Sequence, residues 1–257
     1  IVAVDLTFTG TLGNVAVVLA GDAVLGLAVA QADGASISGP GFVTVEGLTE
    51  SADLSGLANA PLGDGEAITV TLAADKDLTF TGNLGGAKVI IPAGASLTIG
   101  GGANVAGATF EVATNGSLAL SADVLDGSVT LAAPTGQAGS ITVSGVDDAA
   151  DFSKVSADLA VTATGAAGTD LDVTATAARF DNVDAFTVPA GSAVTLTAAQ
   201  ANGLTITGDG SVTITEIDAT PAADFSGITA STTVQVDSTV DLMGATLGSD
   251  STLTVVS

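Results

Sequence analysis

Residues 27–45 read LAVAQADGASISGPGFVTV, and residues 196–214 read LTAAQANGLTITGDGSVTI. Both segments follow the pattern L-x-x-A-Q-A-[DN]-G-x-[ST]-I-[ST]-G-x-G-x-V-T-[VI]. Each residue of the first copy has its counterpart 169 positions later, which is 196 minus 27. A chain that repeats its turns and strands in this way is typical of an array of stacked structural units.

A second motif comes a few residues after each copy. It reads ADLSGL at 52–57 and ADFSGI at 223–228, and a third version, ADFSKV, lies at 150–155. An aspartate side chain readily accepts a hydrogen bond from the backbone two residues on and so stabilises a turn. We therefore expect the aspartate to cap a turn and the two apolar residues beside it to fill the interior.

Most of the remaining sequence consists of short runs in which Val, Ile, Leu or Phe alternates with Thr or Ser. Such runs occur at 77–81, 96–99, 117–120, 128–131, 140–143, 194–197, 204–207 and 212–215. Strict alternation places apolar residues on one face and hydroxyls on the other, as in a half-buried β-strand. Gly, Asn and Asp punctuate these runs every 8 to 12 residues, which indicates tight turns.

These features predict an all-β fold, specifically a β-solenoid (parallel β-helix) with irregular rungs. Very short strands and few aromatic residues favour it over the alternative, tandem β-sandwiches. At roughly 20 residues per coil, the chain would form about a dozen rungs. Single helical turns are expected only at 198–201 and 222–226, and residues 1–257 are expected to form one continuous domain.

The composition excludes much of catalytic chemistry. The chain has no Cys, His, Trp or Tyr, and its 28 acidic residues against 4 basic ones give a formal charge of −24. Without His or Cys, ordinary zinc, haem and iron–sulfur sites and Ser-His-Asp or cysteine nucleophiles are absent. So few basic residues also disfavour nucleic acid and anionic membrane surfaces as partners. No stretch suits a membrane-spanning helix, so membrane insertion is not expected.

Calcium is the first candidate ligand, because acidic residues beside turn glycines are oxygen donors suited to a hard cation. The candidates are Asp64, Glu66, Asp147, Asp148 and Asp209. The calcium-binding repeat G-G-x-G-x-D is not matched, so ordinary solvated turn aspartates remain the alternative. No other cofactor is expected.

Two further functions can be weighed from the sequence. Asp147 and Asp148 could form the carboxylate pair of a glycan-cleaving β-helix, but Lys154 is the only basic residue near them and no aromatic sugar platform exists. We therefore predict that the protein is not an enzyme.

Thr-x-Thr pairs such as Thr195/Thr197 and Thr213/Thr215 would form a regular hydroxyl and methyl face if they stacked, as in some ice-binding solenoids. The alternative is that Thr merely suits solvent-facing strand positions.

The repeated segment together with its Ala-Asp-Phe-Ser-Gly-Ile motif resembles bacterial β-strand-repeat surface proteins, the Thr/Ala/Gly-rich chains of large adhesins, S-layer-like proteins and extracellular fibres. The resemblance is sharpest at residues 27–57 and 196–230. It implies an extracellular or cell-surface structural role and no defined active site.

The leading hypothesis is therefore a non-enzymatic extracellular structural protein that self-assembles into, or extends, a cell-surface fibre or layer. Residues 1–9 and 251–256 read as strands without polar caps, so copies are expected to pair head to tail through open strand edges. The main alternative is an adhesin or an ice- or surface-binding module that acts through a Thr-rich face.

Overall fold

The structure is a computed structural model. It describes residues 5–13, 15–21, 23–59, 67–174, 180, 182–217, 223–237, 246–248 and 251–256. The chain divides into two compact units. Unit 1 consists of Ile1–Leu120, Ser128–Ile141 and Lys154–Leu159, and unit 2 of Ser121–Gly127, Thr142–Ser153 and Ala160–Ser257. The expectation of one continuous domain stays a prediction.

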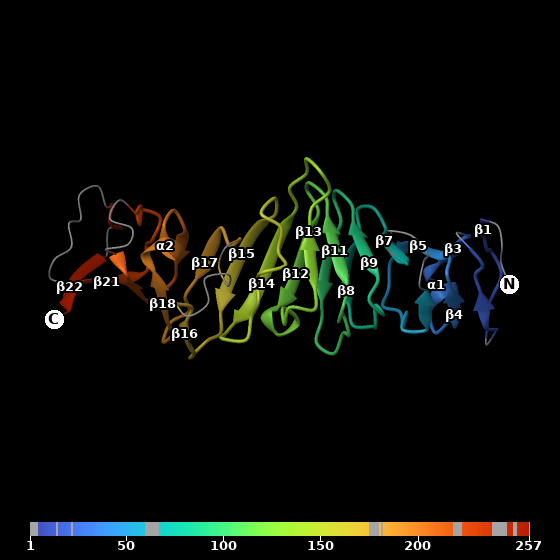
Figure 1. The fold of residues 1–257 in the computed structure, drawn as a ribbon, viewed down its shortest axis with the longest axis horizontal. Helices are drawn as coiled ribbons and strands as arrows, with labels where there is room; N and C mark the ends of the chain where they lie inside the picture. Colours follow the sequence, from blue (N-terminus) through green and yellow to red (C-terminus); the bar gives the residue numbers. More distant parts are fainter. Residues whose placement is uncertain are drawn as a thin grey trace. The chain divides into compact units, whose positions relative to one another are not determined.

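The fold is an all-β solenoid of about 11 turns, built almost entirely from parallel strands. The predicted β-solenoid is thus confirmed, and the alternative of tandem β-sandwiches is wrong. In unit 1 a seven-stranded sheet contains β1 (Leu6–Thr7), β3 (Val24–Ala28), β5 (Phe42–Leu48), β7 (Ile68–Leu72), β9 (Lys88–Ile91), β11 (Thr109–Val112) and β13 (Thr130–Ala132), in that order. Figure 1 shows β7, β9 and β11 as neighbouring arrows.

Further sheets form the other sides of the coil. Unit 1 also contains β2 (Val17–Val18), β4 (Ile37–Gly39) and β6 (Leu57–Asn59), and then β8 (Asp77–Phe80), β10 (Ser96–Ile99) and all but the last residue of β12 (Ser117–Ser121). Strand β14 (Ser140–Val146) contains the boundary between the units. Unit 2 contains β15 (Ala160–Gly165), β17 (Ala185–Thr187) and β19 (Thr205–Thr207), and a five-stranded sheet of β16 (Asp170–Asp172), β18 (Ala193–Thr197), β20 (Ser211–Thr215), β21 (Ser231–Asp237) and β22 (Ser251–Val256).

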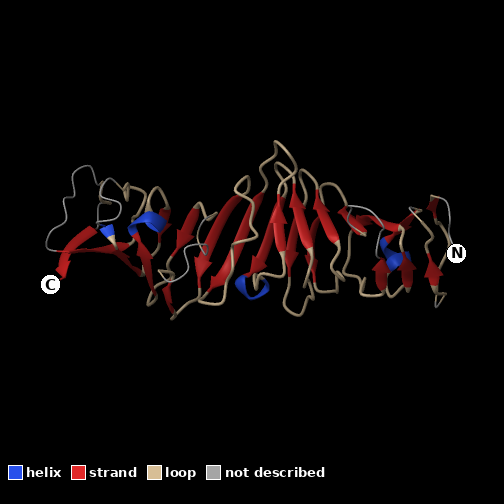
Figure 2. Cartoon of the chain, in the orientation of Figure 1, coloured by secondary structure: helices blue, strands red, loops and turns tan. Residues whose placement is uncertain are grey.

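Helix is confined to very short pieces in the described residues (Figure 2), one of which is represented by the single 3₁₀ residue Ile217. Three others have defined bounds. These are α1 (Val29–Ala32), α2 (Ala198–Ala201) and the 3₁₀ turn η1 (Ala122–Val124). The helical turn predicted at 198–201 is confirmed. The one predicted at 222–226 is wrong over 223–226, where Asp224 makes a bridge to Thr246 and a turn comes next. Backbone pairing with a neighbouring turn of the coil overrides the local helical propensity of this short segment.

Apolar side chains stack in register inside the coil. In unit 1, residues at one inward position form a buried column of Leu27, Val45, Val70, Val89, Phe110 and Leu131. Residues paired in register lie on adjacent turns, so small and medium side chains fill the narrow interior. This packing explains why the alternating runs of the sequence need no large aromatic filler except a few phenylalanines.

Successive turns differ in length. In unit 2, Leu171 pairs with Val194, and Val194 pairs with Val212, which gives one turn of 23 residues (194 minus 171) and one of 18 (212 minus 194). Strand registers remain in step because the extra residues lie in the corners. Unequal corners are the physical reason why the sequence shows no constant short period.

The glycine that ends the shared I-[ST]-G segment is required by a close backbone approach. Gly39 and its counterpart Gly208 have φ of +112° and +110°. A Cβ at Gly39 would lie 2.1 Å from the carbonyl oxygen of Leu19, and one at Gly208 would lie 2.2 Å from that of Val188. No other residue fits such a position, so both copies keep glycine to let adjacent turns come together.

Candidate functional site

The two repeat copies build the same corner from the same contacts. In the second copy, the Oε1 atom of Gln200 accepts a hydrogen bond from the backbone N–H of Thr197 (2.8 Å), and its Nε2 donates to the carbonyl oxygen of Val173 (2.8 Å). In the first copy, Gln31 bonds Ala28 N–H (2.7 Å) and the Gly10 carbonyl (2.6 Å) in the same way. The glutamine thus caps its own short helix and links it to the preceding turn of the coil.

The residue after each corner helix joins it to the next turn of the coil. Asp33 Oδ1 accepts from the backbone N–H of Asp53 at 2.7 Å, and its counterpart Asn202 Oδ1 accepts from Asp224 N–H at 2.8 Å. The next residue, a glycine in both copies, donates its N–H to the carbonyl oxygen of the same aspartate at 2.8 Å. These contacts explain why Asp and Asn alternate freely at this position, since either side chain offers the accepting oxygen.

The second motif forms the predicted capped turn in all three versions. The Oδ1 atoms of Asp53, Asp151 and Asp224 accept from the N–H two residues later, at 3.1, 2.8 and 2.9 Å. The apolar residues beside them are buried: Leu54 and Leu57, Phe152 and Val155, and Phe225 and Ile228. Aspartate as turn cap and apolar neighbours as interior filling are therefore both confirmed.

Serine and threonine hydroxyls lower the pKa of three exposed carboxyls, two of them in this motif (Asp53 and Asp224) and one at Asp172 of β16. At Asp53 the side-chain hydrogen bond from Ser55 and then its backbone N–H lower the pKa below the ordinary value. Thr174 does the same for the pKa of Asp172, and Ser226 for that of Asp224. Hydrogen bonds donated to the charged form stabilise the carboxylate. These acids therefore stay ionised at neutral pH and act as structural acceptors.

Three of the five residues proposed for calcium, Asp147, Asp148 and Asp209, are among the described residues. Asp147 and Asp148 come after β14, where Asp147 Oδ1 accepts from Ala149 N–H at 2.9 Å. Asp209 is exposed between β19 and β20. Asp64 and Glu66 lie outside the described residues. Across the described ranges, no three acidic side chains gather as a metal site, and calcium binding stays a prediction.

Asp209 does face a shallow hollow of about 470 Å³ in unit 2. Asp170 and the hydroxyl-bearing Ser192 and Ser231 also line it. One oxygen of Asp170 is already held by the backbone N–H of Ala193 at 3.0 Å, and Ser192 donates to the Ala166 carbonyl at 3.0 Å. The hollow therefore brings two carboxylates to one region and no third.

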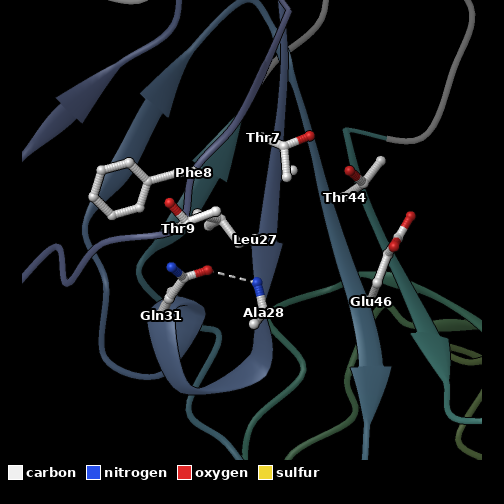
Figure 3. Close-up of a pocket in the computed structure, with 9 residues that line it drawn as sticks. Thr7, Phe8, Thr9, Leu27, Ala28, Gln31, Thr44 and Glu46 are labelled. Atoms are coloured by element: carbon white, nitrogen blue, oxygen red, sulfur yellow. Dashed lines mark hydrogen bonds between the residues drawn. The ribbon is translucent and has the colours of Figure 1, made fainter.

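A second hollow, of about 490 Å³, lies in unit 1 beside the first corner helix (Figure 3). Phe8, Gln31 and Glu46 are among its lining side chains. Both polar groups of Gln31 are engaged by backbone atoms, so Glu46 supplies the only carboxylate of the lining. General acid–base catalysis of sugar or ester cleavage normally uses two positioned titratable groups, and this hollow offers one.

The strand edges at the first and last described turns form a different kind of candidate site. Strand β1 pairs only with β3, and β22 pairs only with β21, within the part of the chain that the structure describes. The exposed large apolar side chains of the described residues are Leu6, Val15 and Val18 beside the first edge and Leu247 beside the last. A strand edge with unpaired N–H and C=O groups beside bare apolar side chains is a template for another strand.

Comparison of the chain with protein-family models, with curated proteins and with solved structures finds no match. The resemblance to bacterial surface repeats therefore stays a prediction. In the described residues, no helix is long and apolar enough to cross a membrane.

Sequence reasoning missed the role of the corner glutamines, although a signal was available. Gln31 and Gln200 are the same residue in both repeat copies, and each uses both ends of its side chain to hold the backbone of two turns. A polar residue kept in a repeat whose outward positions vary indicates a structural hydrogen bond.

Exposure of Val15 and Val18 could not be foreseen, because alternation alone does not show which strand lies at an edge.

Proposed function

We propose that this protein is a non-enzymatic structural building block of an extracellular fibre or cell-surface layer, in which copies stack head to tail. The observation that carries the proposal is the location of the exposed apolar side chains. Among the described residues, the exposed large apolar side chains Leu6, Val15 and Val18 lie in the first described turn, and Leu247 lies in the last. Stacking a second copy on these turns would bury Leu6, Val18 and Leu247 and extend the strand pairing.

The strands at the two edges also belong to corresponding sheets of the repeat. The 169-residue offset maps β3 and β5, which share a sheet with β1, onto β18 and β20, which share a sheet with β22. Each edge therefore belongs to the same side of its coil. In β22, Leu253 pairs with buried Val234, and in β1, Leu6 pairs with buried Leu25. A β22 edge placed against a β1 edge would continue both the ladder and the interior column of the solenoid.

An extracellular location is supported by composition and by the resemblance to surface repeat proteins. A cysteine-free fold depends on no particular redox environment. A charge of −24 keeps a β-rich surface soluble and limits lateral association between sheets. The absence of cysteine decides no compartment, and the strong negative charge suits a β-rich protein that has to stay in solution.

The test is elongation of the purified protein, monitored by light scattering and negative-stain electron microscopy over a concentration series. The informative variant is Val18→Glu, which places a charge on an exposed valine of the first edge. Its matched control is Thr98→Glu, at an exposed position of β10 inside unit 1, with the same change in net charge. Fibres or sheets are expected for the unmodified protein and for the control, and their loss for Val18→Glu.

A single species at every concentration would contradict the proposal, as would equal assembly of Val18→Glu and the unmodified protein. Circular dichroism of both variants establishes that each retains its β-structure, so that a loss of assembly is attributed to the edge.

A further inference from the structure

The outward face of β18, β20, β21 and β22 in unit 2 is unusually regular. Strand registers align Thr195 with Thr213, Thr213 with Thr233, and Thr233 with Thr252. These four residues form one column, called here the threonine column. Beside it lie Thr197, aligned with Thr215, and Gln235, aligned with Thr254. Adjacent strands repeat every ~4.8 Å, so the threonine column extends over roughly 14 Å at one hydroxyl and one methyl per strand.

The hydroxyls of the threonine column are available to the solvent side. In the described residues, no side-chain hydrogen bond engages Thr195, Thr213, Thr233 or Thr252. The neighbouring hydroxyls are used internally: Thr197 bonds Gln200, and Thr215 donates to the Leu196 carbonyl at 3.2 Å. The threonine column is therefore a row of four hydroxyls on four adjacent, paired strands.

The fold itself does not demand threonine at these positions. In the first repeat copy, the counterparts of Thr195, Thr197 and Thr215 are Gly26, Ala28 and Glu46. The inward residues of the two copies stay apolar and buried throughout. Within the threonine column, the counterpart of Thr213 is also a threonine, Thr44, whereas that of Thr195 is Gly26. The strand therefore does not require threonine at the position of Thr195.

The face is also uncharged in a strongly acidic chain. None of its eight residues is ionisable, although the chain has 28 acidic residues. Acidic residues lie only at its borders, for example Asp172 on β16 and Glu216 after β20. In unit 1, the counterpart sheet is interrupted by Lys88 and Glu111, which form a 2.6 Å ion pair across β9 and β11. These eight positions are therefore neutral, whereas the same sheet contains Asp170 and Asp172 on β16 and Asp237 at the end of β21.

We propose that this threonine face binds ice. An ionised side chain keeps its own hydration shell, whereas a neutral row of hydroxyls and methyls can share hydrogen bonds with water ordered at a fixed spacing. A polysaccharide crystal fits less well, because the face contains no aromatic ring for a sugar to contact and the chain has no Trp or Tyr. The inference goes beyond the structural function and does not depend on assembly.

The experiment measures how much protein is taken up into a slowly growing ice surface, together with the gap between the freezing and melting temperatures of the solution. Thr213→Lys interrupts the threonine column at its second strand. Thr205→Lys is the matched control, at an exposed outward position of β19 in another sheet of unit 2. We expect the unmodified protein and Thr205→Lys to be enriched in ice, and Thr213→Lys to lose that enrichment.

Exclusion of the unmodified protein from ice would overturn the inference, and so would an equal loss in both lysine variants. Binding to crystalline cellulose that is sensitive to Thr213→Lys would also overturn it, in favour of a glycan surface. The same measurements on Val18→Glu separate ice binding from head-to-tail stacking. Circular dichroism shows that each variant is folded.

Discussion

At Asp53, one carboxylate oxygen serves two donors of the same residue, the backbone N–H and the hydroxyl of Ser55, at 3.1 and 2.6 Å. The same arrangement at Asp172 uses Thr174, at 3.0 and 2.7 Å. Both carboxylates are exposed, so water screens the interactions and each is a small contribution to stability. The turn is therefore more stable when the carboxyl is ionised than when it is protonated.

Replacing Ser55 by alanine is expected to raise the pKa of Asp53 toward the ordinary carboxyl value of 3.8, because the largest stabilising hydrogen bond to the carboxylate is removed. Since the folded-state pKa is lowered, the stabilising contribution of Asp53 is present above 3.8 and disappears as pH falls through the folded value. Nuclear magnetic resonance titration of the Asp53 carboxyl carbon measures the change.

Asp53→Asn is the companion variant, because Asn83 and Asn104 already form the same turn with neutral side chains, accepting at 3.0 and 3.3 Å. It should remain folded and lose the acid-dependent part of its stability. An unchanged Asp53 titration in Ser55→Ala would show that the hydroxyl does not hold the carboxylate.

At the level of the elements, the repeated motif keeps an interior position whose size varies. Leu54 in the first copy corresponds to Phe225 in the second, and both are fully buried. Phe152 fills the same position in the third version and contacts Phe180, with ring centroids 6.3 Å apart. The same corner position is therefore filled by leucine in one version of the motif and by phenylalanine in the other two.

Phe225→Ala is expected to destabilise the solenoid around β19 to β21 by about 3–5 kcal/mol, since it removes a fully buried ring and leaves a cavity. Phe225→Leu should cost clearly less, because leucine is the native filling of the corresponding corner. Urea denaturation measures the loss of stability. Hydrogen exchange shows whether the loss is confined to neighbouring turns, as expected for a fold whose turns contact only their neighbours. Equal losses for Ala and Leu would argue against the size-matched interior.

For the whole molecule, charge is the dominant surface property. The formal charge is −24, and within the described residues the pair Lys88–Glu111 is the sole ion pair within 4.0 Å. Like charges therefore face solvent with little local compensation. Repulsion between two such chains opposes stacking at any edge and has to be screened before apolar contact at the edges can prevail.

Head-to-tail assembly is therefore expected to increase steeply with ionic strength, from about 0.01 M salt, where the Debye length is ~30 Å, to about 1 M, where it is ~3 Å. Light scattering across a sodium chloride series measures it. A parallel series with calcium at matched ionic strength, reversed by a chelator, distinguishes screening from site binding at acids such as Asp209. Assembly that is indifferent to salt would refute the role given to charge.

The solenoid could be predicted from the sequence because it is determined by features of short, local stretches of sequence. Alternation in runs such as 96–99 and 211–215 defines an inward and an outward face, and the aspartate motif specifies corners. It did not predict which strands pair with which, because turns of 18 and 23 residues hide the period, as at Val194. Nor could it place the threonine column: Thr233 and Thr252 come from strands whose register depends on corners of unequal length.

The unequal turns have a consequence for how such a gene can change. Because extra residues collect in corners, codons can be gained or lost there while every strand keeps its partner and every inward side chain keeps its neighbours. The two copies at 27–45 and 196–214 illustrate the outcome, since they retain the buried pattern while their outer residues diverge. Related sequences can therefore gain or lose corner residues and exchange outward side chains by small steps, each compatible with folding.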